Sequence, residues 1–183
     1  MKIILGISGS IAAYKAAFLT RLLVKEGAEV QVLMTESAKA FITPLTLSTL
    51  SKRPVLSEVI SESGWNNHVE LGLWADALVI APATANTLAK LANGLCDNIL
   101  SAVYLSARCP VFVAPAMDVD MWHHPATQAN ISRLEAHGVK IIPVGYGELA
   151  SGLVGDGRMA EPEDIVAFIN AFLEKSKILA GKR

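Results

Sequence analysis

The sequence has 183 residues, which corresponds to a single domain at the usual size of about 150 residues. Its 16 basic and 17 acidic residues are scattered and leave a formal charge of −1, which argues against a basic face for nucleic acid or anionic lipid. With 52% hydrophobic and 18% charged residues, the chain is too apolar for disorder and can bury a core. We expect one folded domain, with neither nucleic acid nor a membrane as a partner.

The cysteines and the start of the chain indicate a reducing compartment. Cys96 and Cys109 lack the spacing of a thiolate zinc site, so we predict buried free thiols and no metal site. The apolar run at the start of the chain is too short for a signal peptide or a membrane span. We therefore expect a cytoplasmic protein.

Short apolar runs alternate with amphipathic stretches along the chain. Residues 2–7 form a β-branched run, residues 11–26 carry apolar side chains at helical spacing, and residues 29–34 are apolar again. This β-α-β unit predicts parallel strands with a right-handed crossover. Further strands are predicted at 77–81, 110–114 and 140–144, and helices at 84–93, 97–107, 125–137 and 163–175. The alternation predicts an α/β fold: a doubly wound, mostly parallel sheet in a three-layer sandwich of the Rossmann or flavodoxin type.

Two stretches interrupt this pattern. Residues 52–67 are polar and weakly periodic, which indicates a loop or a short extra strand. Residues 143–164 hold five of the 13 glycines and show no clear period, so we predict a long functional loop there. We place the folded domain at residues 1–175 and a tail or linker at residues 176–183.

Small and hydroxyl side chains follow the predicted strands, at the edge where open α/β sheets bind ligands. The turn at residues 6–10 precedes a helix N-terminus, which favours a phosphate. Because it is not GxGxxG and the second strand ends in Met34-Thr35, where a dinucleotide fold would have an acid for the ribose, a mononucleotide fits better than a dinucleotide. Residues 84–87 and 116–118 follow two further strands. The alternatives are an ordinary tight turn at residues 6–10 and a plain N-cap at Thr84.

His68 lies at the predicted start of a helix. Histidine exchanges protons readily near neutral pH, so His68 is a candidate general acid or base, and a structural or exposed histidine is the alternative. We interpret His123 and His124 as loop residues and His137 as a cation at a helix end.

Several motifs in order resemble those of the flavin-containing cysteine decarboxylases. They are GSIAAYK at 9–15, HVEL with WADALVIAPATANTLAK at 68–90, PAMDVDMW at 115–122 and ASGLVGDGRM at 150–159. The resemblance spans about residues 1–175 and is strongest to the phosphopantothenoylcysteine decarboxylase unit of the bifunctional coenzyme A biosynthesis proteins. It implies FMN-dependent decarboxylation of 4'-phosphopantothenoylcysteine to 4'-phosphopantetheine.

The resemblance also implies roles for individual residues. His68 would be the catalytic histidine, the glycine-rich segment would be a flap over the substrate, and a trimer or dodecamer would hold FMN at its subunit interfaces. A synthetase, fused or separate, would be a partner. The substrate would be bound by Met117, Asp118 and Arg158, and FMN by Gly9, Ser10, Ile11, Thr35, Ser37, Thr84, Ala85, Asn86, Thr87 and Ala116.

Two positions depart from the family pattern. The asparagine that holds the substrate carboxylate is Asp118 here, and an ionised aspartate repels another carboxylate. The flap cysteine, a proton donor during reduction of the enethiol, is Ser151 here, and an aliphatic hydroxyl is a much weaker acid than a thiol. We expect oxidative decarboxylation to survive, while reduction slows or uses another donor. The alternatives are a peptidyl-cysteine decarboxylase and a non-catalytic FMN-binding regulatory or assembly subunit.

Overall fold

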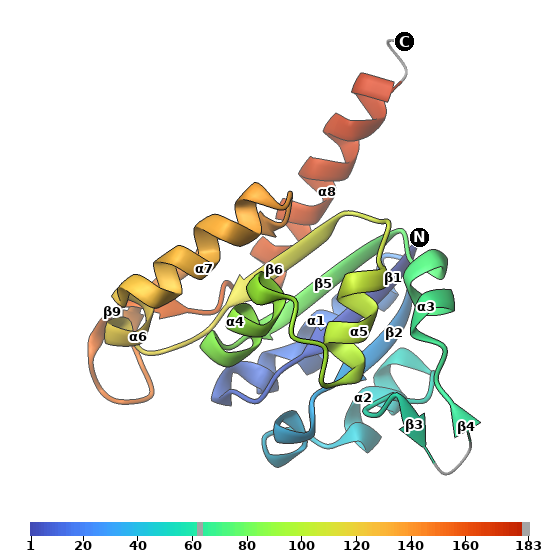
Figure 1. The fold of residues 1–183 in the computed structure, drawn as a ribbon, viewed down its shortest axis with the longest axis horizontal. Coiled ribbons are helices and arrows are strands. Elements are labelled where there is room, and N and C mark those ends of the chain that lie inside the picture. Colours follow the sequence, from blue (N-terminus) through green and yellow to red (C-terminus); the bar gives the residue numbers. More distant parts are fainter. Residues whose placement is uncertain (62–63, 181–183) are drawn as a thin grey trace.

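A five-stranded parallel sheet forms the centre of the computed structural model, which describes residues 1–61 and 64–180 (Figure 1). The strand order is β2-β1-β5-β6-β7, so the chain leaves β1 toward β2 on one side and returns to β5 on the other. The carboxyl ends of the strands beside such a reversal form the usual ligand crevice. The strands are β1 (Lys2–Ile7), β2 (Glu29–Met34), β5 (Ala77–Ala83), β6 (Val111–Pro115) and β7 (Lys140–Ile141).

Helices cover both faces of the sheet, which confirms the predicted doubly wound α/β fold. One face carries α1 (Lys15–Lys25), α2 (Pro44–Ser51) and α8 (Pro162–Ala180). The other carries α3 (His68–Trp74), α4 (Ala85–Asn93), α5 (Ile99–Ser106) and α7 (Pro125–Ala136). The short helices η1 (Ile11–Tyr14), η2 (Glu36–Ala40) and α6 (Val119–His123) lie in connections.

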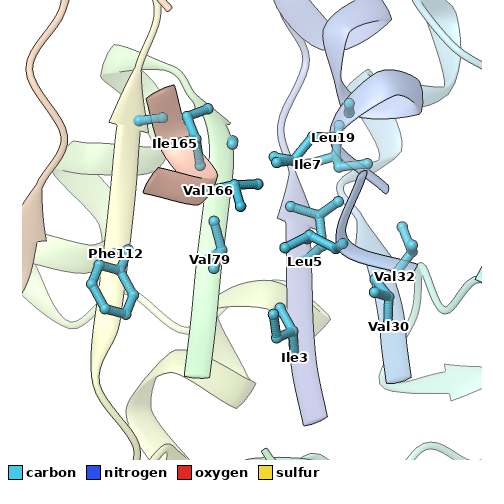
Figure 2. Close-up of a cluster of buried hydrophobic side chains, with 14 of the residues drawn as sticks. Ile3, Leu5, Ile7, Leu19, Val30, Val32, Val79, Phe112, Ile165 and Val166 are labelled. Carbon is cyan, nitrogen blue, oxygen red and sulfur yellow. The ribbon is translucent and has the colours of Figure 1, made fainter. Parts of the chain in front are cut away.

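The strands read as continuous apolar runs because both of their faces are buried. Ile3, Leu5 and Ile7 of β1 belong to the same cluster as Leu19 of α1, and Figure 2 shows them together. Ile4, between them in sequence, belongs to the cluster on the opposite face. Through this alternation, β1 packs against both helical layers.

The structure corrects one prediction about the irregular segments and agrees with another. The glycine-rich segment 143–164 is not a structureless loop, because β8 (Gly145–Glu148) and β9 (Val154–Arg158) pair there as an antiparallel hairpin. The sequence pattern did not reveal this hairpin, because glycines occupy every second position of β9 and leave no alternation of apolar and polar side chains. Residues 52–67 contain the short strands β3 (Ile60–Ser61) and β4 (Gly64–Trp65), in line with the expected extra strand.

The last helix is longer than predicted. Helix α8 continues to Ala180, past the predicted end at residue 175, because neither glycine nor proline occurs between Pro162 and Gly181. A domain boundary at residue 175 stays a prediction. None of the helices in residues 1–61 and 64–180 has the length and apolar character needed to cross a membrane.

Candidate functional site

A cavity of about 410 Å³ opens at the carboxyl edge of the sheet, between the β1–α1 connection, the end of β6 and the β8–β9 hairpin. Segments far apart in the sequence meet around it. Its lining includes six of the predicted site residues: Ser10, Ile11, Ala116, Met117, Asp118 and Arg158. The structure therefore brings predicted cofactor-binding and substrate-binding residues to one place.

Ser8, a buried residue that was not predicted as a site residue, connects the ends of two strands at this edge. Its Oγ donates a hydrogen bond to the Pro82 carbonyl oxygen at 2.6 Å and accepts one from the Thr84 N–H at 3.0 Å. The ends of β1 and β5 are thereby joined. The N–H of Ala116 donates to the Ala83 carbonyl oxygen at 3.0 Å, which adds the end of β6.

The predicted cofactor residues that follow β1 and β2 also meet. A side chain at Gly9 would clash with Oγ of Ser37, so only glycine allows the β1 turn to pass this close to the segment after β2. Oγ of Ser37 lies 3.1 Å from Oγ1 of Thr35. The hydroxyls of Thr35 and Ser37 thus lie beside the Gly9–Ser10 turn.

Thr84 serves as the N-cap of α4, which was the alternative interpretation of this residue. Its Oγ1 accepts the N–H of Thr87 at 3.2 Å. Ala85 is half-buried and Asn86 is exposed in the first turn of the helix. A helix N-terminus next to a glycine turn presents N–H donors that suit a phosphate.

The β8–β9 hairpin rests on the segment after β6. The Met117 N–H donates to the Gly157 carbonyl oxygen at 3.0 Å, and Gly157 has φ +130°. A Cβ at Gly157 would clash with the Met117 carbonyl oxygen, so glycine is needed for this approach. Leu149 and Ala150, which were not predicted, line the cavity from the hairpin turn. The exposed Ser151 follows them and is not in the lining, and its Oγ accepts the Leu153 N–H at 3.3 Å.

Lys15 ties the end of the hairpin to α1. Its ammonium donates to Glu161 at 2.7 Å and to the Met159 carbonyl oxygen at 3.1 Å, and its side chain is only 8% exposed. Arg158 lies 4.0 Å from the same Glu161 carboxylate. Sequence reasoning missed Lys15 as a site residue, although it ends the motif GSIAAYK.

Replacing Lys15 with methionine is expected to destabilise the fold by about 2 kcal/mol, the typical value of hydrogen bonds to a charged group. The change removes both bonds and leaves the Met159 carbonyl oxygen without this donor. Urea unfolding measures the loss. Lys39→Met is the matched control because the Lys39–Glu36 pair is exposed, and we expect a loss below about 0.5 kcal/mol there. Equal losses in the two variants would contradict this role of Lys15.

His68 lies away from the cavity. Asn67 caps α3 by accepting the Glu70 N–H at 3.1 Å, and the Trp65 ring meets the His68 imidazole edge-on at 6.0 Å. Nδ1 of His68 is buried and has no hydrogen-bond partner among the described residues. Figure 1 shows α3 and the β3–β4 hairpin on one side of the molecule and α6 and β9 on the other. A single chain therefore does not bring His68 to Asp118.

The other histidines and the cysteines lie outside the cavity lining. His123 ends α6 rather than lying in a loop, and its Nε2 is 3.5 Å from Oδ2 of Asp156 on β9. Cys96 is exposed, contrary to prediction, because it lies in the connection between α4 and α5. Cys109 is half-buried, and burial raises the pKa of its thiol. Within the part of the chain that the structure describes, no three His, Cys, Asp or Glu residues gather as a metal site.

Comparisons with known proteins agree with this geometry. A family model described as Flavoprotein matches residues 1–174. A "Cysteine/Cysteine sulfinic acid decarboxylase" from an unknown prokaryotic organism is 62% identical over 148 residues, covering 78% of this chain and 41% of that protein. A "Probable phosphopantothenoylcysteine decarboxylase" of Streptococcus mutans is 49% identical over 169 residues, covering 90% of this chain and 94% of that protein.

Solved structures show the same fold. A cysteine-to-serine mutant of a phosphopantothenoylcysteine decarboxylase, complexed with pantothenoylaminoethenethiol, has a TM-score of 0.83 at 38% identity and covers 94% of this chain and 98% of that chain. Other similar structures are described as FMN-dependent or FMN-binding. The first relatives matched include bifunctional coenzyme A biosynthesis proteins of Vibrio species, and this chain spans only 41 to 46% of the length of these first relatives.

Proposed function

Because the chain belongs to the Flavoprotein family, we propose that it is an FMN-dependent decarboxylase that converts 4'-phosphopantothenoylcysteine to 4'-phosphopantetheine. The family membership confirms the predicted resemblance. One observation carries the proposal: residues of three of the four motifs line the cavity at the carboxyl edge, including three of the ten predicted FMN contacts and all three predicted substrate contacts. The similarity to a probable phosphopantothenoylcysteine decarboxylase along nearly its whole length supports the substrate. A cytoplasmic location stays a prediction.

The residues at the carboxyl edge fit an FMN. Hydroxyls of Ser10, Thr35 and Ser37 and the first turn of α4 offer neutral donors for a phosphate, and none of the predicted contacts is acidic. Gly9 leaves space where a side chain would collide. When bound, FMN supplies two-electron oxidation and reduction. The protein's own part is to hold the substrate beside it and to exclude water with the β8–β9 hairpin.

We propose that a second copy of the chain supplies His68 to the cavity, in a homotrimer or dodecamer. Ile11 and Tyr14 of η1 line the cavity and are 58% and 52% exposed, respectively. Phe18, on the following helix α1, is 60% exposed. Apolar side chains gathered in this way are typical of protein interfaces. His68 would then exchange a proton with the substrate of the neighbouring chain, and the unpartnered Nδ1 of His68 would gain a partner there.

Replacing Ser151 with cysteine tests the proposed reaction. We expect the unchanged protein, assayed in air with 4'-phosphopantothenoylcysteine, to give phosphopantetheine together with a product that lacks two further hydrogens, because a hydroxyl is a poor proton donor for the reduction. In Ser151→Cys the rate of phosphopantetheine formation should rise about tenfold and the unsaturated product should fall. Mass spectrometry separates the two products. The matched control is Ser48→Cys, because Ser48 lies on α2 outside the cavity lining.

A yellow protein that forms neither product would contradict the proposal and favour the non-catalytic flavoprotein. A second candidate substrate is free cysteine or cysteine sulfinic acid, and the 62% identical relative named for these substrates favours it. Turnover of a peptide with a C-terminal cysteine alone would favour the peptidyl-cysteine decarboxylase. A synthetase partner, fused or separate, belongs to the same proposal and is supported by the bifunctional relatives.

A further inference from the structure

A negatively charged substrate is bound best where positive side chains are free to pair with it, and the charged side chains of this cavity do not offer that. Four charged side chains line it: Lys15, Arg158, Asp118 and Glu148. Both cations face the Glu161 carboxylate outside the lining, at 2.7 Å from Lys15 and 4.0 Å from Arg158. Within residues 1–61 and 64–180, the carboxylates of Asp118 and Glu148 have no hydrogen bond or ion pair. The cavity therefore has unpaired negative charge.

Asp118 is the more enclosed of these two carboxylates. It is half-buried at the N-cap position of α6, yet its side chain accepts no hydrogen bond from that helix, whereas Glu148 is exposed. The Asp118 backbone is held by the Trp122 N–H, which donates to its carbonyl oxygen at 2.9 Å. The main chain thus holds Asp118 in place while its carboxylate makes no hydrogen bond to the helix, so the carboxylate is available for a ligand.

The group that such a carboxylate selects is a cation with N–H donors. In 4'-phosphopantothenoylcysteine the α-nitrogen is an uncharged amide, whereas a free cysteine-type amino acid carries an α-ammonium group at the same carbon. A carboxylate–ammonium pair shielded from water is stronger than a neutral hydrogen bond. Asp118 would repel the carboxylate of any substrate, and an adjacent ammonium offsets that repulsion.

We infer that Asp118 is a specificity-determining residue that binds the α-ammonium group of an unacylated cysteine-type amino acid. This inference rests on the proposed function, since it takes the cavity as the substrate site of the decarboxylase. The site then accepts free cysteine as well as the acylated substrate. In the redox-neutral reaction the Cα–carboxylate bond breaks, CO₂ leaves and a proton takes its place on Cα, so cysteine gives cysteamine.

The test compares substrates that differ at the α-nitrogen. The FMN-loaded protein and its Asp118→Asn variant are assayed for release of labelled CO₂ from L-cysteine, L-cysteine sulfinic acid, N-acetyl-L-cysteine and 4'-phosphopantothenoylcysteine. We expect Asp118→Asn to lower kcat/KM for the free amino acid about thirtyfold, mainly through KM, and to raise it for both acylated substrates. Asp120→Asn, an exposed position on α6 outside the cavity lining, is the control with the same change of charge.

The outcomes separate the two claims. A protein that decarboxylates the acylated substrate but neither free amino acid overturns the inference and leaves the proposed function intact. Equal substrate preference in Asp118→Asn and the unchanged protein also overturns it. Inactivity of the FMN-loaded protein on all four substrates overturns both. Selective loss of activity on the free amino acid in Asp118→Asn, with Asp120→Asn unaffected, supports the inference.

Discussion

Replacing His68 with asparagine is expected to lower kcat/KM for decarboxylation about a thousandfold while the purified protein keeps its flavin. Asparagine has a similar size and can still form hydrogen bonds, but it cannot carry a proton between the substrate and water. His68 does not line the cavity and is not one of the predicted FMN contacts, so flavin binding should survive. Release of labelled CO₂ measures the activity, and visible absorbance measures the bound flavin.

The control for this variant is His137→Asn. His137 is an exposed histidine at the end of α7 and is outside the cavity lining, so its loss should leave kcat/KM within about twofold. If His68→Asn retained the activity of the unchanged protein, His68 would be a structural residue packed against Trp65 and the proposed proton transfer would be wrong.

Replacing Gly157 with alanine is expected to lower kcat/KM about a hundredfold, because a Cβ at φ +130° would clash with the backbone carbonyl of Met117. A backbone atom cannot move aside as a flexible side chain can, so β9 must shift away from Met117. A displacement of about 1 Å at a catalytic site is enough for such a loss. Hydrogen exchange at the Met117 N–H, which donates to Gly157, measures the detachment of the hairpin directly.

Gly138→Ala separates conformational strain from the clash. Gly138 also has a positive φ, +90°, but a Cβ added there would meet no other atom within 4 Å, and the residue follows α7 outside the cavity lining. This control should lose about 1 kcal/mol of stability and keep its activity. Normal activity and normal exchange in Gly157→Ala would show that the hairpin does not need the close contact.

Together, His68→Asn and Gly157→Ala reveal how the site is assembled. If a neighbouring copy supplies His68, oligomers formed by co-expressing the two variants contain some sites with both an intact cavity and an intact histidine. The mixture then regains activity that neither variant has alone. Activity equal to the sum of the two separate variants would place both groups in the same chain.

Sequence reasoning succeeded for buried strands, which are apolar throughout, and for the small and polar residues that follow strands at the carboxyl edge of the sheet. The runs of β1 and β2 were predicted with their observed bounds because buried parallel strands are apolar on both faces. The cavity residues Ser10, Ala116 and Asp118 were found because they follow strands that end at the same edge.

Sequence reasoning failed where a contact between segments distant in the chain determines the structure. The β8–β9 hairpin depends on Gly157 meeting Met117, 40 residues earlier in the chain, and no local periodicity records that meeting. The distance of His68 from the cavity within one chain likewise depends on how α3 packs on α5. A side chain at Gly72 would clash with the Ser106 backbone there. Helix α2, in contrast, carried a signal that went unused: Thr43 as N-cap and Pro44 in the first turn.

The cavity is built from segments that are distant in sequence, around Ser10, Met117, Leu149 and Met159, so it exists only while the whole domain is folded. A ligand that fills it binds the native state and not the unfolded chain. It therefore shifts the folding equilibrium by RT ln(1 + [L]/Kd), about 2.7 kcal/mol at a concentration of 100 Kd. The melting temperature of the protein thus becomes a direct gauge of cavity occupancy, and a panel of amino acids and acylated thiols can be ranked by heating alone, without any turnover.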